Sequence, residues 1–507
     1  MRSLKASAAI AALALTGCAT SALDLAPPSA SAAWTPAVSA SGAIQAAPST
    51  TNNGAAGYVL PPNPILAVLP SAPPIDPHQL YGLAGLIDIA ESNNPQTRIA
   101  WDQARQMALA AGITESAYLP QITASAVGAY QNNDSHNSIS GLENSGDDEA
   151  HGVISAVSLN WLLFDFGERA ATIEAAKQLS IVSNIGFTAA HQQVIYEVSL
   201  AFYSYAAARY HVTAAEQSLQ DAQAVQAAAQ ARYAHGIGTI VDADQAAQAT
   251  AQARLAVVQA RGTVQDAYLA LLTAMGVSPL TKITIAGAPQ RPLSPALDKP
   301  VQDIVAQALA RRPDMLSAYA AEQASLANVR AAQAEFMPKL FLSATGAYSS
   351  SGLDITALPG VGQQQGIENL SGSRLGGSIL AGVTVPLYDG GIRSAALAQA
   401  EAGADSAEAA LAKARDEAAR QIVAAANGVQ TSLAAYAAAQ SLAVAAQTSY
   451  DAAYAAYRNG VGSVTAATLA ETQLLQARDA ATDAYSNALS AAATLAFATG
   501  ALGTAPP

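Results

Sequence analysis

The sequence predicts an α+β membrane protein in which three chains together close a twelve-stranded β-barrel, and each chain contributes four strands and long coiled-coil helices. Three observations favour this class. Between Asn160 and Lys177 an alternating apolar pattern changes to a helical one, as when a strand runs into a helix. The same junction returns at Val385–Ala396. Alanine is the main contributor to a 51% hydrophobic content with only 6% aromatic residues, which is typical of long, closely packed helices.

The repeat extends through most of the chain. Gly236-Ile-Gly238 returns as Gly460-Val-Gly462 at an offset of 224 residues, whereas Pro95 returns as Pro313 at an offset of 218. The second copy therefore carries six extra residues, between Tyr348 and Val385. A fixed period decides the architecture before any local pattern does. It predicts a first repeat over residues 78–276, a connector over 277–300, a second repeat over 301–500 and a tail over 501–507.

The charge and the polar residues exclude several functions. A net charge of −13 cannot neutralise phosphates, which excludes nucleic acid as a partner. The six histidines form no pair at helical metal-ligand spacing and the chain has one cysteine, so no metal is expected. Neither Gly-x-Gly motif has the third glycine of a dinucleotide loop. We therefore expect neither an enzyme nor a cofactor.

The N-terminal region has the features of an export signal followed by an anchor. Residues 1–17 have a basic start and an apolar run that is too short to span a membrane. The run ends in Leu15-Thr-Gly-Cys18, which resembles a bacterial lipobox, and Cys18 is the only cysteine. We expect lipid on Cys18. The residue after it is Ala19, which resembles the pattern of lipoproteins that are sorted to the outer membrane. Residues 18–77 are rich in Ala, Ser and Pro, which predicts an extended tether.

The first repeat begins with a helical pattern over Leu80–Tyr118 that breaks and restarts at Asn94-Pro95, because proline suits the first turn of a helix. Alternating patterns over Gln121–Gln131 and Val153–Trp161 predict two strands joined by a long polar loop over residues 132–150. The second repeat predicts strands over Leu340–Tyr348 and Ile379–Val385, separated by a Gly-rich loop. Strands of about ten residues suit a tilted transmembrane strand.

After each junction the apolar period changes to that of a coiled coil. In the first copy the pattern predicts one long helix over Asp165–Tyr233 and a shorter one over Val241–Ala274. The seam residues of the long helix step by four and three, as Val194, Val198, Ala201, Tyr205, Ala208, Val212, Ala215, Leu219 and Ala222. The second copy repeats the seam from Ala418 to Ala446.

Four strands cannot close a barrel, and open strand edges are not tolerated in lipid, where each unpaired backbone group costs several kcal/mol. Other chains must therefore complete the sheet. Two copies would supply eight strands and leave little lumen, whereas three supply twelve, so a cyclic homotrimer is expected.

Together, the lipobox, the Asn-Pro helix start, the Phe-Asp-Phe-Gly and Tyr-Asp-Gly-Gly junctions and the Gly-x-Gly turns resemble the TolC-like outer-membrane factor family. The similarity covers residues 78–500 and is greatest to the lipoprotein branch of OprM and NodT type. It implies a trimeric outer-membrane barrel that continues into a periplasmic helical tunnel and exports solutes. It also implies the partners: a periplasmic adaptor protein and an inner-membrane pump of RND, MFS or ABC type.

The resemblance also implies functional residues near the two helical turns. It places adaptor-docking tips at Ile237, Gly238, Thr239, Val461, Gly462 and Ser463, although glycine also simply permits a turn. It places the periplasmic aperture at Asp242, Asp244, Thr468 and Glu471. Carboxylates near a helix N-terminus are also mildly favoured for structural reasons.

Two alternatives stay open at this point. The chain could be the exit duct of a type I protein secretion system, because one sequence does not select the exported substrate. The lipobox favours small-molecule efflux. A trimeric coiled-coil adhesin or scaffold would explain the heptads, but not four strands of membrane-spanning length placed symmetrically between them.

Overall fold

The computed structural model describes residues 25–27, 29–31, 34, 36–48, 58–60, 62–68, 75–139, 142–287, 293, 301–350, 354–355, 370–371 and 375–503. Cys18 and the signal sequence predicted before it lie outside these residues. The chain divides into two units, residues 1–77 with 278–282 and residues 78–277 with 283–507.

The first unit contains a short antiparallel hairpin of β1 (Pro36–Val38) and β2 (Ile44–Pro48). Gly42 has φ 77° in the turn between them, a conformation that glycine adopts without steric cost. The Asn63 side chain donates to the Gly42 carbonyl at 2.9 Å. The composition predicts an extended chain here, so this hairpin is an unpredicted local structure.

The helices of the second unit come in two similar sets. Both long helices have 67 residues and both of the helices that follow them have 35, as the repeat at an offset of 224 requires. The first set is α3 (Leu83–Asn93), α4 (Pro95–Glu115), α5 (Glu168–Ala234) and α6 (Ile240–Ala274). The second set is α7 (Val301–Leu309), α8 (Pro313–Ala334), α9 (Ile392–Arg458) and α10 (Val464–Ala498). None of these described helices combines the length and the hydropathy needed to cross a membrane.

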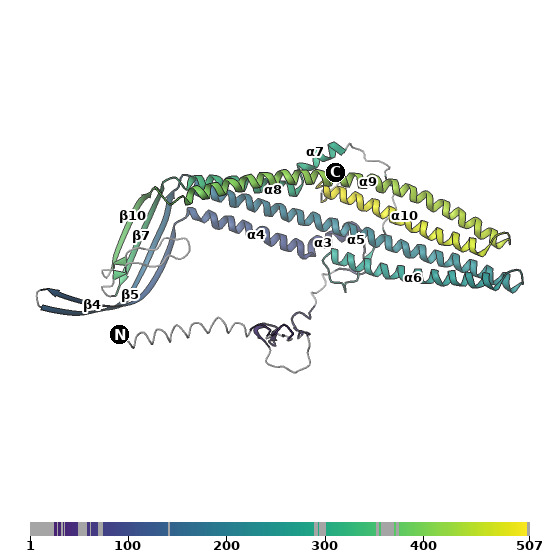
Figure 1. The fold of residues 1–507 in the computed structure, drawn as a ribbon, viewed down its shortest axis with the longest axis horizontal. Helices are drawn as coiled ribbons and strands as arrows, with labels where there is room; N and C mark the ends of the chain where they lie inside the picture. Colours follow the sequence, from purple (N-terminus) through teal and green to yellow (C-terminus); the bar gives the residue numbers. More distant parts are fainter. Residues whose placement is uncertain are drawn as a thin grey trace. The chain divides into compact units, whose positions relative to one another are not determined.

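The small residues of the predicted coiled-coil seam allow the helices to approach closely. In α5, Val194 and Val198 are fully buried and Ala208, Ala215 and Ala222 are at most 4% exposed. In α9, Ala418 and Ile422 are fully buried. α5 packs against α4, α6, α8 and α10, and it is the central helix of the layer (Figure 1).

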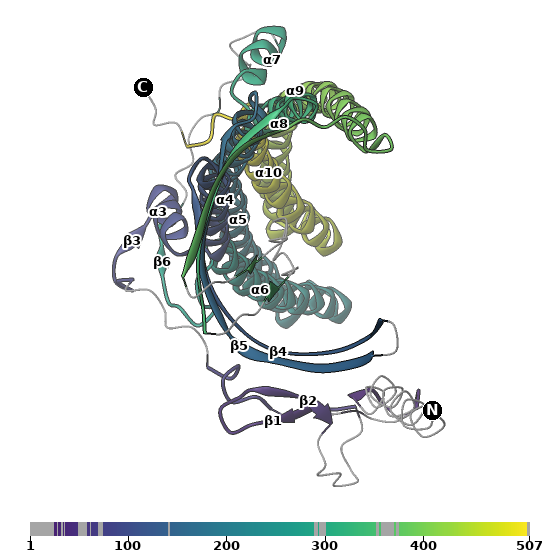
Figure 2. The same cartoon turned by 90° about the vertical axis from the view of Figure 1, so that its left-hand side faces the viewer.

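The four predicted strands form one antiparallel sheet in the order β10-β7-β5-β4. Their bounds are β4 (Gln121–Ile139), β5 (Leu142–Phe164), β7 (Lys339–Ser349) and β10 (Gly376–Thr384). The sheet leaves β4 and β10 as its edges, and β4 and β5 curve strongly along their length (Figure 2).

The prediction of a polar loop over residues 132–150 is wrong. β4 and β5 stay paired through this region up to the Ile139–Leu142 pair, so both strands are about twice the predicted length. Backbone hydrogen bonds hold the ladder whatever the side chains are, and an alternation test detects only strands with one apolar face. In the second repeat, β8 (Asp354–Ile355) and β9 (Leu370–Ser371) form a two-residue pair inside the predicted Gly-rich loop.

The predicted break at Asn94-Pro95 is confirmed, and α3 gives way to α4 there. The Asn94 side chain accepts from the Gln96 amide at 2.9 Å, which caps α4, and its Nδ2 donates to the Ala274 carbonyl at the end of α6, at 3.0 Å. In the second repeat an arginine makes the equivalent contact, since Arg312 Nη1 donates to the Ala498 carbonyl at the end of α10, at 2.6 Å. Each repeat is therefore tied at the same place by a different side chain.

Two short elements complete the second unit. The predicted first helix starts three residues late because Leu80 and Tyr81 form β3, which pairs in parallel with β6 (Thr284–Ile285) of the predicted connector. α7 packs on α9, where Ala308, Ile422 and Ala425 share a buried cluster.

Candidate functional site

Three places in the second unit hold concentrated polar contacts. The strand-to-helix junctions lie where the sheet meets the helices, and the two helical turns lie at the far ends of the hairpins α5/α6 and α9/α10 (Figure 1). The third is the contact between α5 and α10, which joins the two hairpins.

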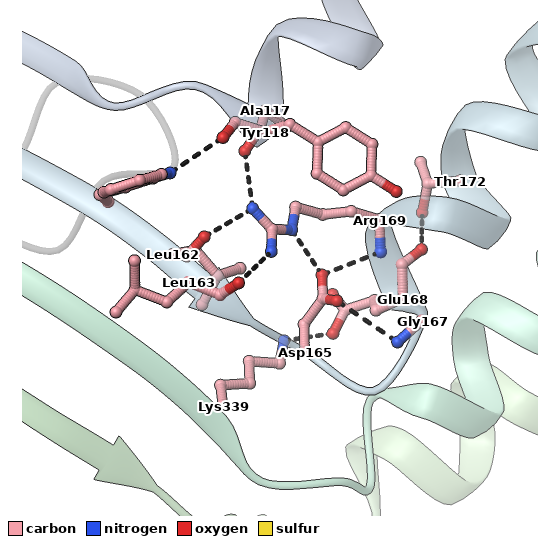
Figure 3. A network of polar contacts seen from close by, with 11 residues as sticks. Ala117, Tyr118, Leu162, Leu163, Asp165, Gly167, Glu168, Arg169, Thr172 and Lys339 are labelled. Atoms are coloured by element: carbon pink, nitrogen blue, oxygen red, sulfur yellow. Dashed lines mark hydrogen bonds and ion pairs between the residues drawn. The ribbon is translucent and has the colours of Figure 1, made fainter.

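The first junction is organised by Asp165, which is 4% exposed (Figure 3). Its Oδ1 accepts from the Gly167 amide at 3.3 Å, and its Oδ2 accepts from the amide and from Nε of Arg169, at 3.0 and 2.7 Å. Gly167 has φ 97°, so the chain can reverse directly before α5. A carboxylate at the start of a helix also interacts favourably with the helix dipole.

Arg169 connects the junction to the elements around it. Its Nη1 donates to the Leu162 and Ala117 carbonyls at 2.6 and 3.0 Å, and its Nη2 donates to the Leu163 carbonyl at 3.3 Å. The guanidinium lies 4.9 Å from the Tyr118 ring centroid. This one side chain therefore joins the end of β5, the segment before β4 and the first turn of α5 (Figure 3).

The second junction repeats this design in part. Asp389 accepts from the amides of Gly391 and Arg393 at 3.0 and 3.1 Å, and Arg393 Nε lies 2.8 Å from Asp389 Oδ2. Arg393 lies over the Phe336 ring as Arg169 lies over Tyr118. Both aspartates stand in the junction motifs predicted from the sequence, whereas the two arginines were not predicted, although the offset of 224 relates Arg169 to Arg393.

The predicted tips are tight turns. In the first, Gly236 has φ 72°, and Thr239 and Asp242 form a reciprocal capping box, with each side chain accepting from the other residue's amide at 3.1 and 3.2 Å. In the second, Gly460 has φ 82° and the Ser463 hydroxyl accepts from the Ala466 amide at 3.1 Å.

The apolar residue at the apex of each turn is exposed, whereas the glycine that follows it is packed against the preceding helix. Ile237 is 66% exposed and Val461 is 84% exposed. A Cβ on Gly238 would lie 3.1 Å from Arg232 Cβ, and a Cβ on Gly462 would lie 3.0 Å from Ala456 Cβ. The two glycines therefore have a packing role in the turns, and the exposed apolar surface belongs to the residues beside them.

The four predicted aperture residues are distributed over two helices. Asp242 and Asp244 lie in the first turns of α6, the former inside the capping box. Thr468 lies on α10 and its hydroxyl donates to the Val464 carbonyl at 3.1 Å. Glu471 is 5% exposed, lies between α10 and α5 and accepts a hydrogen bond from the Ser218 hydroxyl. No hydrogen bond found in the described chain joins these four residues to one another.

The contact between α5 and α10 is a row of polar pairs, here called the α5–α10 seam. Its members other than Ser218 and Glu471 are Tyr196 with Thr494, the Tyr203 carbonyl with Ser486, His211 with Asp479 and Asp483, and Asp221 with Arg478. Burial raises the pKa of the Glu471 carboxyl, and the hydrogen bond from Ser218 and the charge of Arg478 offset only part of that effect. Among the described residues, no group of His, Cys, Asp and Glu side chains has the arrangement of a metal site.

Comparisons with known proteins agree with this architecture. A family model described as outer membrane efflux protein matches residues 86–277 and 304–501. Protein CyaE of Bordetella pertussis is 29% identical over 346 residues, which are 68% of this chain and 68% of that protein. Outer membrane protein OprJ of Pseudomonas aeruginosa is 30% identical over 249 residues, 48% of each chain.

A crystal structure of a membrane protein from Pseudomonas aeruginosa has the same fold, with a TM-score of 0.69 and 26% identity, and the similarity covers 82% of this chain and 93% of that one. The resemblance inferred from the duplicated motifs is thereby confirmed. The chain belongs to the outer membrane efflux protein family.

Proposed function

We propose that the chain is the outer-membrane channel of a tripartite efflux system, which receives solutes from an inner-membrane pump and a periplasmic adaptor and passes them to the exterior. The observation that carries this proposal is the duplicated unit of a strand pair, a 67-residue helix and a 35-residue helix, matched by the efflux family in two blocks. The role is passive transport, with no catalysis.

The sheet supports a homotrimer. β4 and β10 are edge strands in the described sheet, and an unpaired edge in hydrocarbon costs several kcal/mol for each unsatisfied group. Pairing β4 of one copy with β10 of the next removes both edges, and three copies give twelve strands. Lipid on Cys18 would add about 0.8 kcal/mol of anchoring for each buried methylene.

The two turns are the proposed docking sites for the adaptor. Ile237 and Val461 place exposed apolar surface at the ends of the hairpins α5/α6 and α9/α10. Exposed apolar groups at a rigid turn are suited to contact another protein. Thr239 and Ser463 hold the turns by capping the helices that follow.

The aperture is proposed to lie beside these turns and to include Asp242, Asp244, Thr468 and Glu471. In the described conformation Glu471 is covered by α5, so its charge is kept from solvent. The aperture role of Glu471 therefore requires α10 to move away from α5, and three such carboxylates around a narrow opening would favour cations.

Conductance tests the channel function against the adhesin or scaffold alternative. Purified full-length protein added to a planar lipid bilayer is expected to produce discrete current steps of uniform size. A protein that is trimeric and folded but produces no current steps would overturn the proposal and leave the scaffold function.

A further inference from the structure

His211 on α5 contacts two carboxylates of α10 at once. Its Nδ1 lies 2.7 Å from Asp479 Oδ1, and its Nε2 lies 2.8 Å from Asp483 Oδ1. The two aspartates are one helical turn apart, so the ring bridges them along the α10 surface. The imidazole is partly covered, with 24% of its side chain exposed. This contact joins the hairpin α5/α6 to the hairpin α9/α10.

The geometry requires a particular protonation state. An ionised carboxylate can only accept hydrogen bonds, and a neutral imidazole has a single N–H. Both ring nitrogens can therefore donate only when His211 is an imidazolium. When the proton leaves, one of the two contacts becomes a nitrogen lone pair facing a carboxylate oxygen, which is repulsive.

The other charged groups near this contact are engaged elsewhere. Arg209 donates to the Ile285 carbonyl at 3.2 Å, Arg261 of α6 lies 2.7 Å from Glu216, and Arg478 of α10 lies 3.5 Å from Asp221. The remaining titratable side chains on this stretch of α5, α6 and α10 are Tyr203, Tyr205, Tyr210, Asp266, Tyr268 and Tyr485. Among the described residues, protonated His211 is therefore the cationic side chain that contacts both Asp479 and Asp483.

The contact is not part of the duplicated framework. At the offset of 224 residues, Ala435 replaces His211, and Leu255 and Gln259 replace the two aspartates. The counterpart helices α9 and α6 are not among the helix pairs that pack on each other in the described chain, so the His211 contact has no equivalent there. The three side chains therefore belong to the contact between the two hairpins and not to the turn or the packing of either hairpin.

We propose that His211, Asp479 and Asp483 form a proton-controlled latch that holds the second hairpin against the first and releases it as the pH rises. The hydrogen bond to Asp479 is the largest cause that raises the pKa of His211, with Asp483 adding to it and burial opposing it. The latched form thus binds its proton more tightly than the released form. The latch is complete below the ordinary histidine range and is lost as the pH rises through the raised pKa.

Distances between spin labels test the latch directly. Ser204 on α5 and Asn487 on α10 are both exposed and adjoin the contact between the Tyr203 carbonyl and Ser486, so nitroxides on cysteines at these positions report on the seam. Cys18→Ala provides the cysteine-free background. In the full-length protein, the shortest label distance is expected to lengthen between about pH 5 and about pH 9.

The variants decide the interpretation. His211→Gln is expected to abolish the pH-dependent step, and Asp479→Asn and Asp483→Asn are each expected to reduce it. His191→Gln is the matched control, because His191 contacts the single carboxylate of Glu91 on α3, at 3.1 Å, and it should keep the whole step. An unchanged step in His211→Gln, or no step in the wild type, would overturn the latch.

Control of the passage by the latch rests on the proposed function, so conductance is measured separately. The wild type is expected to conduct more at about pH 9 than at about pH 5, and His211→Gln to lose this difference. A label step without conductance at any pH supports the latch and rejects the channel. Conductance without a label step rejects the latch and leaves the channel standing.

Discussion

Asp165 and Asp389 hold the first turns of α5 and α9 in nearly the same way. Each accepts from the amide two residues ahead, at 3.3 and 3.0 Å, and from the amide four residues ahead, at 3.0 and 3.1 Å. Their surroundings differ, because the Asp165 side chain is 6% exposed and that of Asp389 is 28% exposed. The same capping arrangement is therefore enclosed in one repeat and open to water in the other.

This difference predicts unequal costs for two equivalent substitutions. Arg169→Met leaves the buried Asp165 carboxylate with two backbone amides but no cation, and leaves three carbonyls without their donor, so we expect a loss of roughly 3 kcal/mol in stability. Arg393→Met leaves Asp389 within reach of water and should cost clearly less. The thermal unfolding midpoints of the purified variants measure the difference. Equal shifts would show that the carbonyl contacts of Arg169 contribute nothing.

Alanine in place of Gly276 is expected to destabilise the protein, whereas alanine in place of Gly262 is not. Gly276 ends α6 with φ 70°, and a Cβ there would lie 2.7 Å from Asn94 Cα. The left-handed conformation alone costs an alanine about 1–2 kcal/mol, and the backbone contact adds to that. Gly262 lies inside α6 with open space around its Cα, so Gly262→Ala should stabilise the helix by about 0.5–1 kcal/mol. Unfolding midpoints that move in the same direction would contradict this prediction.

Glu471 should make the seam weaker as the pH rises. Burial raises the pKa of its carboxyl, so the folded state binds the proton more tightly than the unfolded state. The stability from this group is complete below the ordinary glutamate value of about 4.3 and is lost as the pH rises through the raised pKa. Glu471→Gln should therefore increase the unfolding midpoint at neutral pH and flatten its pH dependence. Glu408→Gln, at an exposed position of α9, should change neither.

Charge at the apex of the turns should block efflux without unfolding the protein. Ile237→Asp and Val461→Asp alter the two most exposed apolar side chains of the turns, and neither is needed for the caps. We expect loss of solute export in cells that depend on this channel, with normal yield of the trimer. These variants test docking more directly than Gly238→Asp or Gly462→Asp, since both glycines are packed against the preceding helix and their substitution would also disturb the turn. Leu442→Asp, at an exposed position of α9, is the control, and export retained in the tip variants would exclude docking there.

Removal of the predicted lipid should weaken anchoring and leave assembly intact. Cys18→Ala eliminates the acceptor for the acyl chains, whereas closure of the sheet depends on β4 and β10. Fractionation and palmitate labelling measure the outcome. Label retained in the variant would show that Cys18 is not the lipidated residue.

Much of the fold could be predicted because two periods and one offset are visible in the sequence. The break at Asn94-Pro95, the four strands and the long helices all follow from local patterns, and the structure confirms them. The extent of β4 and β5 could not be predicted, because residues 132–150 are mostly polar and show no alternation of apolar and polar residues, whereas the strand pairing continues through them.

The candidate site was less predictable, because its contacts join residues far apart in the chain. His211 meets Asp479 across 268 positions, and Glu471 meets Ser218 across 253. No local spacing encodes such pairs. The family pattern pointed to Glu471 but not to the helix that covers it, since burial depends on how the hairpins pack. The role of Arg169 could have been predicted from the repeat, because Arg393 occupies the same position in the second copy.

The unequal strands have a consequence at the cell surface. β5 pairs with β7 only up to Ile154, and beyond that residue it continues with β4 as a two-stranded arm. At about 3.4 Å per residue, the 19 residues of β4 exceed the roughly 30 Å of a bilayer core about twofold. In the proposed orientation this arm extends beyond the hydrocarbon core into the medium outside the cell. Because exposed connecting segments tolerate sequence change, related strains should differ over residues 132–149 while the helices stay alike.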